Sequence, residues 1–192
     1  ILGSIAPLED CYLPNLFPGQ KIAINEFKQL GEWLVLAGVD ILLLETMNSI
    51  SETESALIGI KNLDVPVWVS FIMKDKNFLL SGDSIKDALK MLHDYYIDCV
   101  LFNCNPLHIT LMTVENIVDN DHFNWGVCPN LGVGEPSSDG CINHYEKMQD
   151  FISVMKKIIS LGPFVIGACC GSSPKHIAEL NKLRNKSRSS SN

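Results

Sequence analysis

The sequence lacks an excess of basic residues, because 15 Lys and Arg stand against 22 Asp and Glu and the formal net charge is −7. Nucleic acids and anionic membranes attract proteins with clustered positive charge, so we expect neither as a partner. No apolar run approaches the roughly 20 residues of a membrane-spanning helix. The opening Ile1-Leu2-Gly3-Ser4 also lacks the basic flank of a secretory signal, so we expect no export.

The number of cysteines is odd, and no two of them have the CxxC spacing that is typical of structural metal sites. Secreted disulfide scaffolds are usually shorter and have paired cysteines. Several of these thiols lie inside apolar runs, which favours a reducing compartment, and we therefore expect a cytoplasmic protein. The five histidines show no metal-ligand spacing either. The seven cysteines are Cys11, Cys99, Cys104, Cys128, Cys141, Cys169 and Cys170.

Short apolar runs alternate with amphipathic stretches along the whole chain. Such alternation predicts parallel strands that are joined by helical crossovers, which is the α/β class. The run Ile41-Leu42-Leu43-Leu44 shows almost no polar alternation, which indicates a strand buried on both faces. The predicted strands are 1–5, 39–44, 65–71, 98–103, 125–128 and 164–168, and the predicted helices are 21–37, 51–62, 84–95, 107–118, 145–161 and 173–184.

Distinctive residues follow the carboxyl ends of at least four predicted strands, namely Glu45, Cys104, Asn130 and the pair Cys169–Cys170. An open doubly wound sheet collects its ligands at one crevice, whereas a ring of strand ends around one centre is typical of a barrel. We therefore expect a parallel (β/α)8 TIM-type barrel domain over residues 1–184, with about six of its eight β/α units present. The Ser-rich polar segment 185–192 is expected to be a disordered tail.

Three of the thiols lie just past two predicted strands: Cys104 after one, Cys169 and Cys170 after the other. Three thiolates that meet at this edge would hold Zn²⁺ and leave a fourth position open for water or a substrate sulfur, as in catalytic zinc sites. The spacing alone leaves two alternatives open. The thiols could merely pack in the core, or the adjacent pair could form a disulfide and act as a redox switch.

Three polar residues at strand ends are further candidates for binding a ligand. Glu45 ends a buried apolar run, where a carboxylate is costly unless it is paired or used. It could bind the ammonium group of an amino-acid substrate, or it could be a solvated acid, and the sequence alone favours neither. Asn103 and Asn130 could orient a ligand, although each taken singly is more typical of a turn.

Five segments of the chain resemble, in order, the motifs of the homocysteine S-methyltransferase family. The most distinctive is 167–177, which contains the adjacent cysteines, and Phe102-Asn103-Cys104 resembles the upstream Asn-Cys motif of the family. The other three segments are the strand end 40–46, the opening 3–7 and Pro129-Asn130 with its glycine-rich loop. The resemblance extends over nearly the whole chain, to about Leu183.

This resemblance implies a (β/α)8 barrel that uses Zn²⁺ to activate homocysteine. The thiol of homocysteine would attack an activated methyl group of a second small molecule, and methionine would form. The resemblance also implies the site residues: Cys104, Cys169 and Cys170 as zinc ligands, Glu45 as the acid that holds the amino group of homocysteine, and Thr46, Asn103 and Asn130 as further substrate-binding residues.

The methyl donor stays open among S-methylmethionine, S-adenosylmethionine, betaine and a methylfolate. Thr46 stands where an aromatic residue would suggest a cage for betaine, so betaine is disfavoured. Family members have about two further strand–helix units before the segment that matches Gly3, so we expect the chain to be N-terminally incomplete. Two open sheet edges would then favour a homo-oligomer. The alternative function is an inactive zinc-binding remnant or a partner-binding module.

Overall fold

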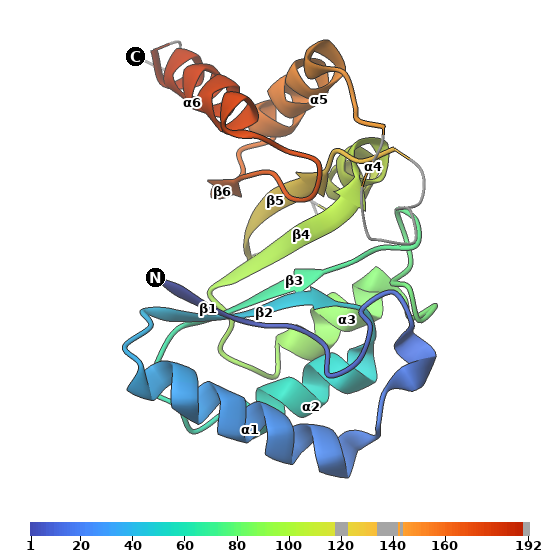
Figure 1. Cartoon of the computed structure of the whole chain (residues 1–192), viewed down its shortest axis with the longest axis vertical. Coiled ribbons are helices and arrows are strands. Elements are labelled where there is room, and N and C mark those ends of the chain that lie inside the picture. Colours follow the sequence, from blue (N-terminus) through green and yellow to red (C-terminus); the bar gives the residue numbers. More distant parts are fainter. Residues whose placement is uncertain (118–122, 134–141, 143, 190–192) are drawn as a thin grey trace.

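Six parallel strands form one sheet, and their order in space is the same as their order in the sequence (Figure 1). The computed structural model describes residues 1–117, 123–133, 142 and 144–189. Consecutive pairing without reversal is the arrangement of a barrel and differs from a doubly wound sheet. The strands are β1 (Leu2–Ile5), β2 (Ile41–Met47), β3 (Val67–Phe71), β4 (Cys99–Pro106), β5 (Asn124–Asn130) and β6 (Val165–Ile166).

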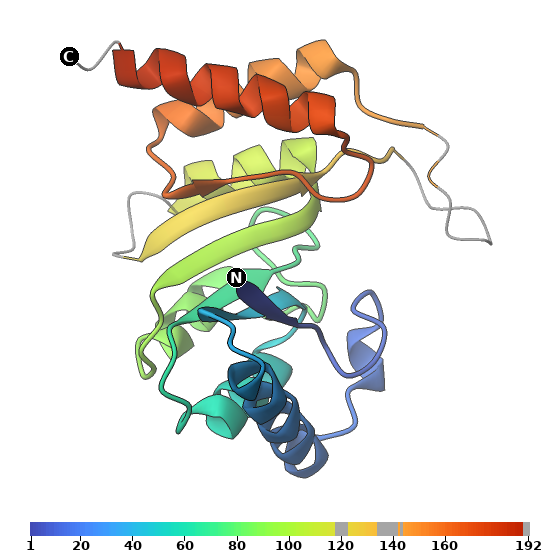
Figure 2. The same ribbon diagram turned by 60° about the vertical axis from the view of Figure 1, so that its left-hand side comes forward.

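The helices alternate with these strands and lie along the outside of the curved sheet (Figure 2). Helices α1 and α2 pack against each other at one end of the sheet, and α5 packs between α4 and α6 at the other. The helices are α1 (Gln20–Leu36), α2 (Ile50–Ile60), α3 (Ile85–Leu92), α4 (Leu107–Ile117), α5 (Met148–Ser160) and α6 (Pro174–Ser189), with a short 3-10 turn at Pro14–Leu16. None of the helices within the described ranges is both long and apolar enough to cross a membrane.

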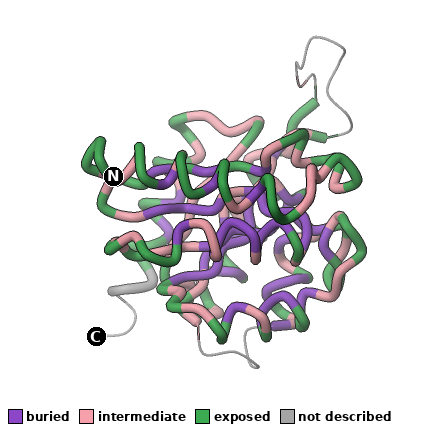
Figure 3. Tube along the Cα trace, turned by 90° about the horizontal axis from the view of Figure 1, so that it is seen from below, coloured by how far each residue is buried: buried purple, intermediate pink, exposed green. Residues whose placement is uncertain are grey.

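Successive residues of each strand face different surroundings, as the pleat requires. In β4, Val100 and Phe102 are buried in the main core beneath the helices. Leu101, which lies between them, belongs to a separate small cluster on the inner face of the sheet. The same alternation carries Asn103 of β4 and Glu45 of β2 to the inner face. The buried segments of the chain appear in purple through the middle of the molecule in Figure 3.

The structure confirms the α/β class and the serial order of the predicted units. Over the described residues the barrel is open, with β1 and β6 as the edges of the sheet. Most boundaries of the strands and helices differ from the prediction by one to three residues. Strand β6 comprises only Val165–Ile166, and α6 continues to Ser189, into the segment for which the sequence predicted disorder.

Helices α1 and α2 approach closely because Gly59 of α2 has no side chain. A Cβ atom at this position would lie 2.7 Å from the carbonyl oxygen of Ile24 and 3.0 Å from the backbone nitrogen of Lys28, both in α1. Backbone atoms cannot move aside as the end of a flexible side chain can. Glycine is therefore the residue that this helix contact requires.

Replacement of Gly59 by alanine should destabilise the fold by about 1–3 kcal/mol, because the methyl group forces α1 and α2 apart. The better helix propensity of alanine offsets part of this cost. Denaturant unfolding followed by circular dichroism measures the difference. The control is Ser51→Ala on the exposed side of the same helix, which should change stability by less than about 0.5 kcal/mol. Equal stability of Gly59→Ala and the parent would contradict the close contact.

Candidate metal centre and its polar network

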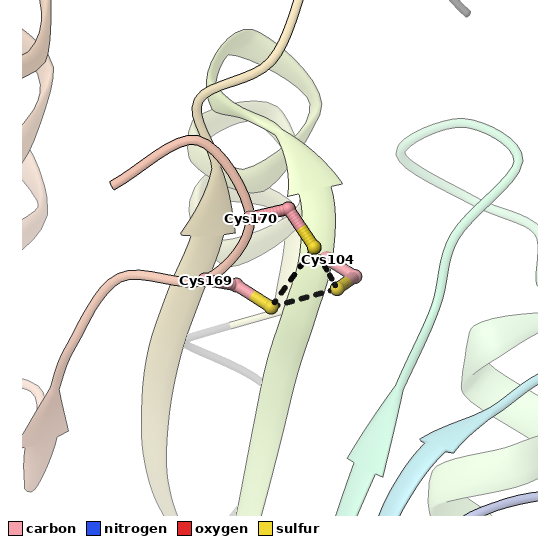
Figure 4. Close-up of side chains that lie close together, drawn as sticks. All are labelled: Cys104, Cys169 and Cys170. Carbon is pink, nitrogen blue, oxygen red and sulfur yellow. Dashed lines mark hydrogen bonds between the residues drawn. The ribbon is translucent and has the colours of Figure 1, made fainter. Parts of the chain in front are cut away.

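Three thiols meet at the carboxyl edge of the sheet, beside the ends of β4 and β5 (Figure 4). The Sγ atom of Cys104 lies 2.7 Å from that of Cys169 and 3.8 Å from that of Cys170. The Sγ atoms of the adjacent pair are 3.9 Å apart. Among the residues that the structure describes, this is the one group of three potential metal-ligating side chains with all ligand atoms so close together.

Backbone geometry turns these thiols toward one another. Cys104 has φ +55°, in the left-handed region that non-glycine residues rarely adopt and that often marks functional sites. The tandem pair is fastened to the end of β5, because the N–H of Cys169 donates to the carbonyl of Pro129 at 2.9 Å and the N–H of Leu131 donates to the carbonyl of Cys170 at 2.8 Å. The pair therefore has a fixed place above the sheet.

The sulfur positions fit a tetrahedral ion that is bound by thiolates. Zn–S bonds of about 2.3 Å place two sulfur ligands of a tetrahedron about 3.8 Å apart. Both distances from Cys170 are close to this value, and the Cys104–Cys169 contact would have to open by about 1 Å. Cys170 is exposed whereas the other two thiols are half-buried, so the cluster can be reached from solvent. Three soft ligands with one accessible side suit Zn²⁺ and an additional ligand.

The three thiols differ in acidity because they are hydrogen-bonded to one another. The hydrogen bond that Cys169 shares with Cys104 lowers the pKa of Cys169 to about 6. The same hydrogen bond, together with burial, raises the pKa of Cys104 far above its usual value. Burial raises the pKa of Cys170 as well. The pKa shifts therefore favour ionisation of Cys169 before that of the other two thiols.

Glu45 is held from two sides on the inner face of the sheet. The hydroxyl of Ser4 in β1 donates to its Oε2 atom at 2.6 Å, and the Nδ2 of Asn103 in β4 donates to its Oε1 atom at 3.4 Å. Each carboxylate oxygen can accept more than one hydrogen bond, so an ammonium group could still be bound. These contacts orient the carboxylate before any ligand arrives.

Asn103 is the buried hub of this network, with only 2% of its surface exposed. Its Oδ1 atom accepts from the hydroxyl of Ser70 at 2.6 Å and from the N–H of Thr46 at 3.1 Å, while its Nδ2 donates to the hydroxyl of Thr46 at 2.7 Å. Thr46 has φ +62°, the second left-handed non-glycine residue at this edge. The hydrogen-bonding capacity of the Asn103 side chain is thus used within this network.

The structure thus brings the predicted Glu45, Thr46 and Asn103 into one network. Asn130 lies apart from these contacts, since its Oδ1 accepts from the N–H of Gly132 at 2.7 Å and shapes the turn after β5. That is the turn role that the sequence also allowed. Cys141 and most of the glycine-rich loop lie outside the described residues.

Sequence reasoning did not single out Ser4 and Ser70 as members of the network. The signal that could have found them is position. Ser70 is a hydroxyl residue within an apolar strand, and Ser4 lies beside Leu43 in the register of β1 and β2, two residues before Glu45. Only a knowledge of which strands are neighbours converts these positions into hydrogen bonds.

A sequence model of a protein family, described as homocysteine S-methyltransferase, matches residues 1–184. Homocysteine S-methyltransferase 2 of Zea mays is 28% identical over 187 residues, which cover 88% of this chain and 52% of that protein. The selenocysteine methyltransferase of Astragalus bisulcatus is 25% identical over 161 residues, which cover 80% of this chain and 47% of that protein. The chain spans about half the length of the curated relatives it matches.

The fold is similar to that of the homocysteine methyltransferase MmuM from Escherichia coli. The metallated form of MmuM gives a TM-score of 0.77 at 22% identity, with 94% of this chain and 60% of MmuM covered. The apo form of MmuM gives a TM-score of 0.76 at 22% identity, with 95% of this chain and 62% of MmuM covered. Identity this low shows a shared fold and leaves the chemistry to be argued from the residues of this chain.

Replacement of Asn103 by leucine should destabilise the protein by about 2–4 kcal/mol, because the hydroxyl of Ser70 and the N–H of Thr46 lose a buried acceptor. Ser70→Ala is the milder comparison, since it removes one donor and leaves the other contacts of Asn103 in place, and it should cost about 0.5–1.5 kcal/mol. Denaturant unfolding of the two variants measures both effects. An Asn103→Leu variant as stable as Ser70→Ala would show that Asn103 is not the hub.

Proposed function

The chain belongs to the homocysteine S-methyltransferase family, and from this premise we propose that it serves in the zinc-dependent transfer of a methyl group to homocysteine, which yields methionine. The observation that carries the proposal is the meeting of Cys104, Cys169 and Cys170 at the carboxyl edge of a barrel-type sheet. In barrels of parallel strands this is the edge where catalysis takes place. We also propose a cytoplasmic location, where reducing conditions keep the thiols free.

The three cysteines would hold Zn²⁺, which when bound lowers the pKa of a coordinated thiol and so keeps homocysteine in its nucleophilic thiolate form near neutral pH. Two features of the chain itself favour thiolates in the cluster. The hydrogen bond with Cys104 lowers the pKa of Cys169 to about 6, which favours its thiolate form. Helix α6 begins at Pro174, shortly after the pair, and the partial positive charge of its N-terminus eases the negative charge on the sulfurs.

Glu45 would receive the ammonium group of homocysteine. Ser4 and Asn103 already hold its two oxygens, so little reorganisation is needed when the cation arrives. Attachment at two points, with the amino group at Glu45 and the sulfur at the thiol cluster, fixes the direction of the nucleophile. A new S–C bond then forms as the bond between the methyl group and the donor breaks, and the donor leaves with the electron pair.

The length of the acceptor is a further variable within the family. Selenocysteine has one side-chain carbon fewer than homocysteine, and methyltransferases named for selenocysteine are among the relatives of this chain. We take homocysteine as the acceptor because the matching family model is named for it. The donor stays open among S-methylmethionine, S-adenosylmethionine and a methylfolate, with betaine disfavoured.

The purified chain should bind about one Zn²⁺, measured by metal analysis after removal of free metal. Alanine at Cys104, Cys169 or Cys170 should each lower the affinity by about 100-fold or more, because a three-thiolate site loses a ligand. Cys99→Ala is the matched control, since this buried thiol lies in the inner hydrophobic cluster and should keep the zinc. A folded parent protein with reduced thiols and no zinc affinity would contradict the proposal.

Zinc binding near pH 7.5 should release about two protons, because Cys104 and Cys170 are protonated there while Cys169, with a pKa of about 6, is ionised. Protons compete with the metal, so the apparent affinity falls as the pH is lowered and falls more steeply below the pKa of Cys169. Calorimetry in buffers of different ionisation enthalpy counts the protons. A release of none would contradict the assigned ionisation states.

Methionine formation from homocysteine with each of the four donors tests the reaction itself. Glu45→Gln should raise KM for homocysteine by about 10–100-fold with a smaller change in kcat, because the variant loses the charge that binds the ammonium group. Its zinc content should stay the same. Glu26→Gln, an exposed residue of α1, is the control. A folded, zinc-loaded chain without turnover on any donor would favour the non-catalytic zinc-binding module.

A further inference from the structure

Cys128 of β5 lies on the inner face of the sheet, next to the residues that hold Glu45. The register pairs Cys128 with Asn103 of β4 and Gly126 with Leu101. Paired residues of neighbouring parallel strands share a face, so the thiol of Cys128 and the side chain of Asn103 lie on the same side. Leu101 belongs to the inner hydrophobic cluster, which identifies that side as the inner one.

The thiol of Cys128 also lies against the segment that leads to the metal centre. A Cβ atom at Gly167 would be 2.6 Å from the Sγ of Cys128, so the sulfur occupies the space that a side chain at position 167 would need. Gly167 itself is held by its N–H, which donates to the carbonyl of Val127 at 2.8 Å. Cys169 follows two residues later. Cys128 therefore lies between Asn103, its neighbour in β4, and the segment that leads to the cysteine pair.

The electrostatics of Cys128 agree with this location. Burial raises the pKa of its thiol to about 12, and the negative charges of Cys169 and Glu45 both add to the rise. The thiol is thus within electrostatic reach of the cluster on one side and of the carboxylate on the other. A neutral, half-buried thiol behaves as a small apolar group and suits contact with hydrocarbon.

We propose that Cys128 lines the span between Glu45 and the thiol cluster and determines the chain length of the amino-acid thiol that is accepted. This inference rests on the proposed function. An acceptor held by its amino group at Glu45 and by its sulfur at the cluster must lay its methylene groups across the residue between these two points. A small side chain there leaves room for the two methylenes of homocysteine, and a bulkier one penalises the longer acceptor first.

The test measures dissociation constants of the zinc-loaded protein for L-homocysteine and L-cysteine by calorimetry. Cys128→Val adds bulk on the span and should weaken homocysteine binding by about 10–100-fold while cysteine binding changes by less than about 3-fold. Cys128→Ser has nearly the size of the parent residue and should retain the parental preference. Cys99→Val, at the opposite end of the same inner face, is the matched control and should also leave the preference unchanged.

A second substitution, Gly167→Ala, places a methyl group against the Cys128 sulfur. Its new methyl group would push the Cys128 sulfur toward the span, so it should reproduce the loss of homocysteine binding. In a Cys128→Ala background that space is vacant, and Gly167→Ala should then have little effect. Such coupling between two contacting positions is what a double-mutant cycle detects, and a general loss of folding would not produce it.

The outcomes separate the inference from the function on which it rests. A parent protein that binds zinc and homocysteine, with unchanged preference in Cys128→Val and additive effects of Gly167→Ala, would overturn the role of Cys128 and leave the proposed function intact. A parent protein that binds zinc but neither amino acid would overturn both. Circular dichroism of every variant confirms that the compared proteins are folded.

Discussion

The curvature of the sheet is the constraint on which the whole site depends. Neighbouring strands are about 4.8 Å apart, so strands that are separated by one other strand lie about 9.6 Å apart in a flat sheet. Yet Asn103 of β4 reaches Glu45 and Thr46 of β2, across β3, and Cys104 of β4 reaches Cys169 beyond β6, across β5. Short side chains make such contacts only on the concave side of a curved sheet. Barrel geometry therefore creates the site as well as supporting it.

Asn103 and Cys104 are the residues of the curved sheet that bring the polar network and the thiol cluster together. They are consecutive residues, one pointing into the polar network and the other into the thiol cluster. The left-handed backbone of Cys104 breaks the alternation of β4 and turns its thiol toward the tandem pair. The left-handed backbone of Thr46 is held by the hydrogen bond from its N–H to Asn103. The buried amide of Asn103 thus stabilises Thr46 and binds Glu45, and the adjacent Cys104 links this network through the backbone to the sulfurs.

The sequence predicts the parts of this arrangement that depend on local pattern. Apolar periodicity indicates the strands and helices, and their strict alternation indicates that Cys104, Cys169 and Cys170 lie at one edge. Local pattern does not predict the left-handed backbone of Thr46 or the hydrogen bonds of Ser4 and Ser70. These features depend on partners that are distant in the sequence: Asn103 lies 33 residues from Ser70 and 57 residues from Thr46. The sequence also placed the end of α6 too early. In this case local composition misled the prediction, because the polar end of the helix resembles a disordered tail.

The thiol cluster also bears on the stability of the last β/α unit. Strand β6 pairs with β5 through only two residue pairs, which is a short ladder for the attachment of an entire unit. Helix α5 packs against α6 and so contributes the rest of the attachment, together with the two backbone hydrogen bonds that fasten Cys169 and Cys170 to the end of β5. An ion shared by Cys104 and the tandem pair would join β4 directly to the segment after β6. The ligands of the site would then be a structural link of the fold, and the affinity for metal and the order of the C-terminal unit would rise and fall together, as expected wherever metal binding is coupled to folding.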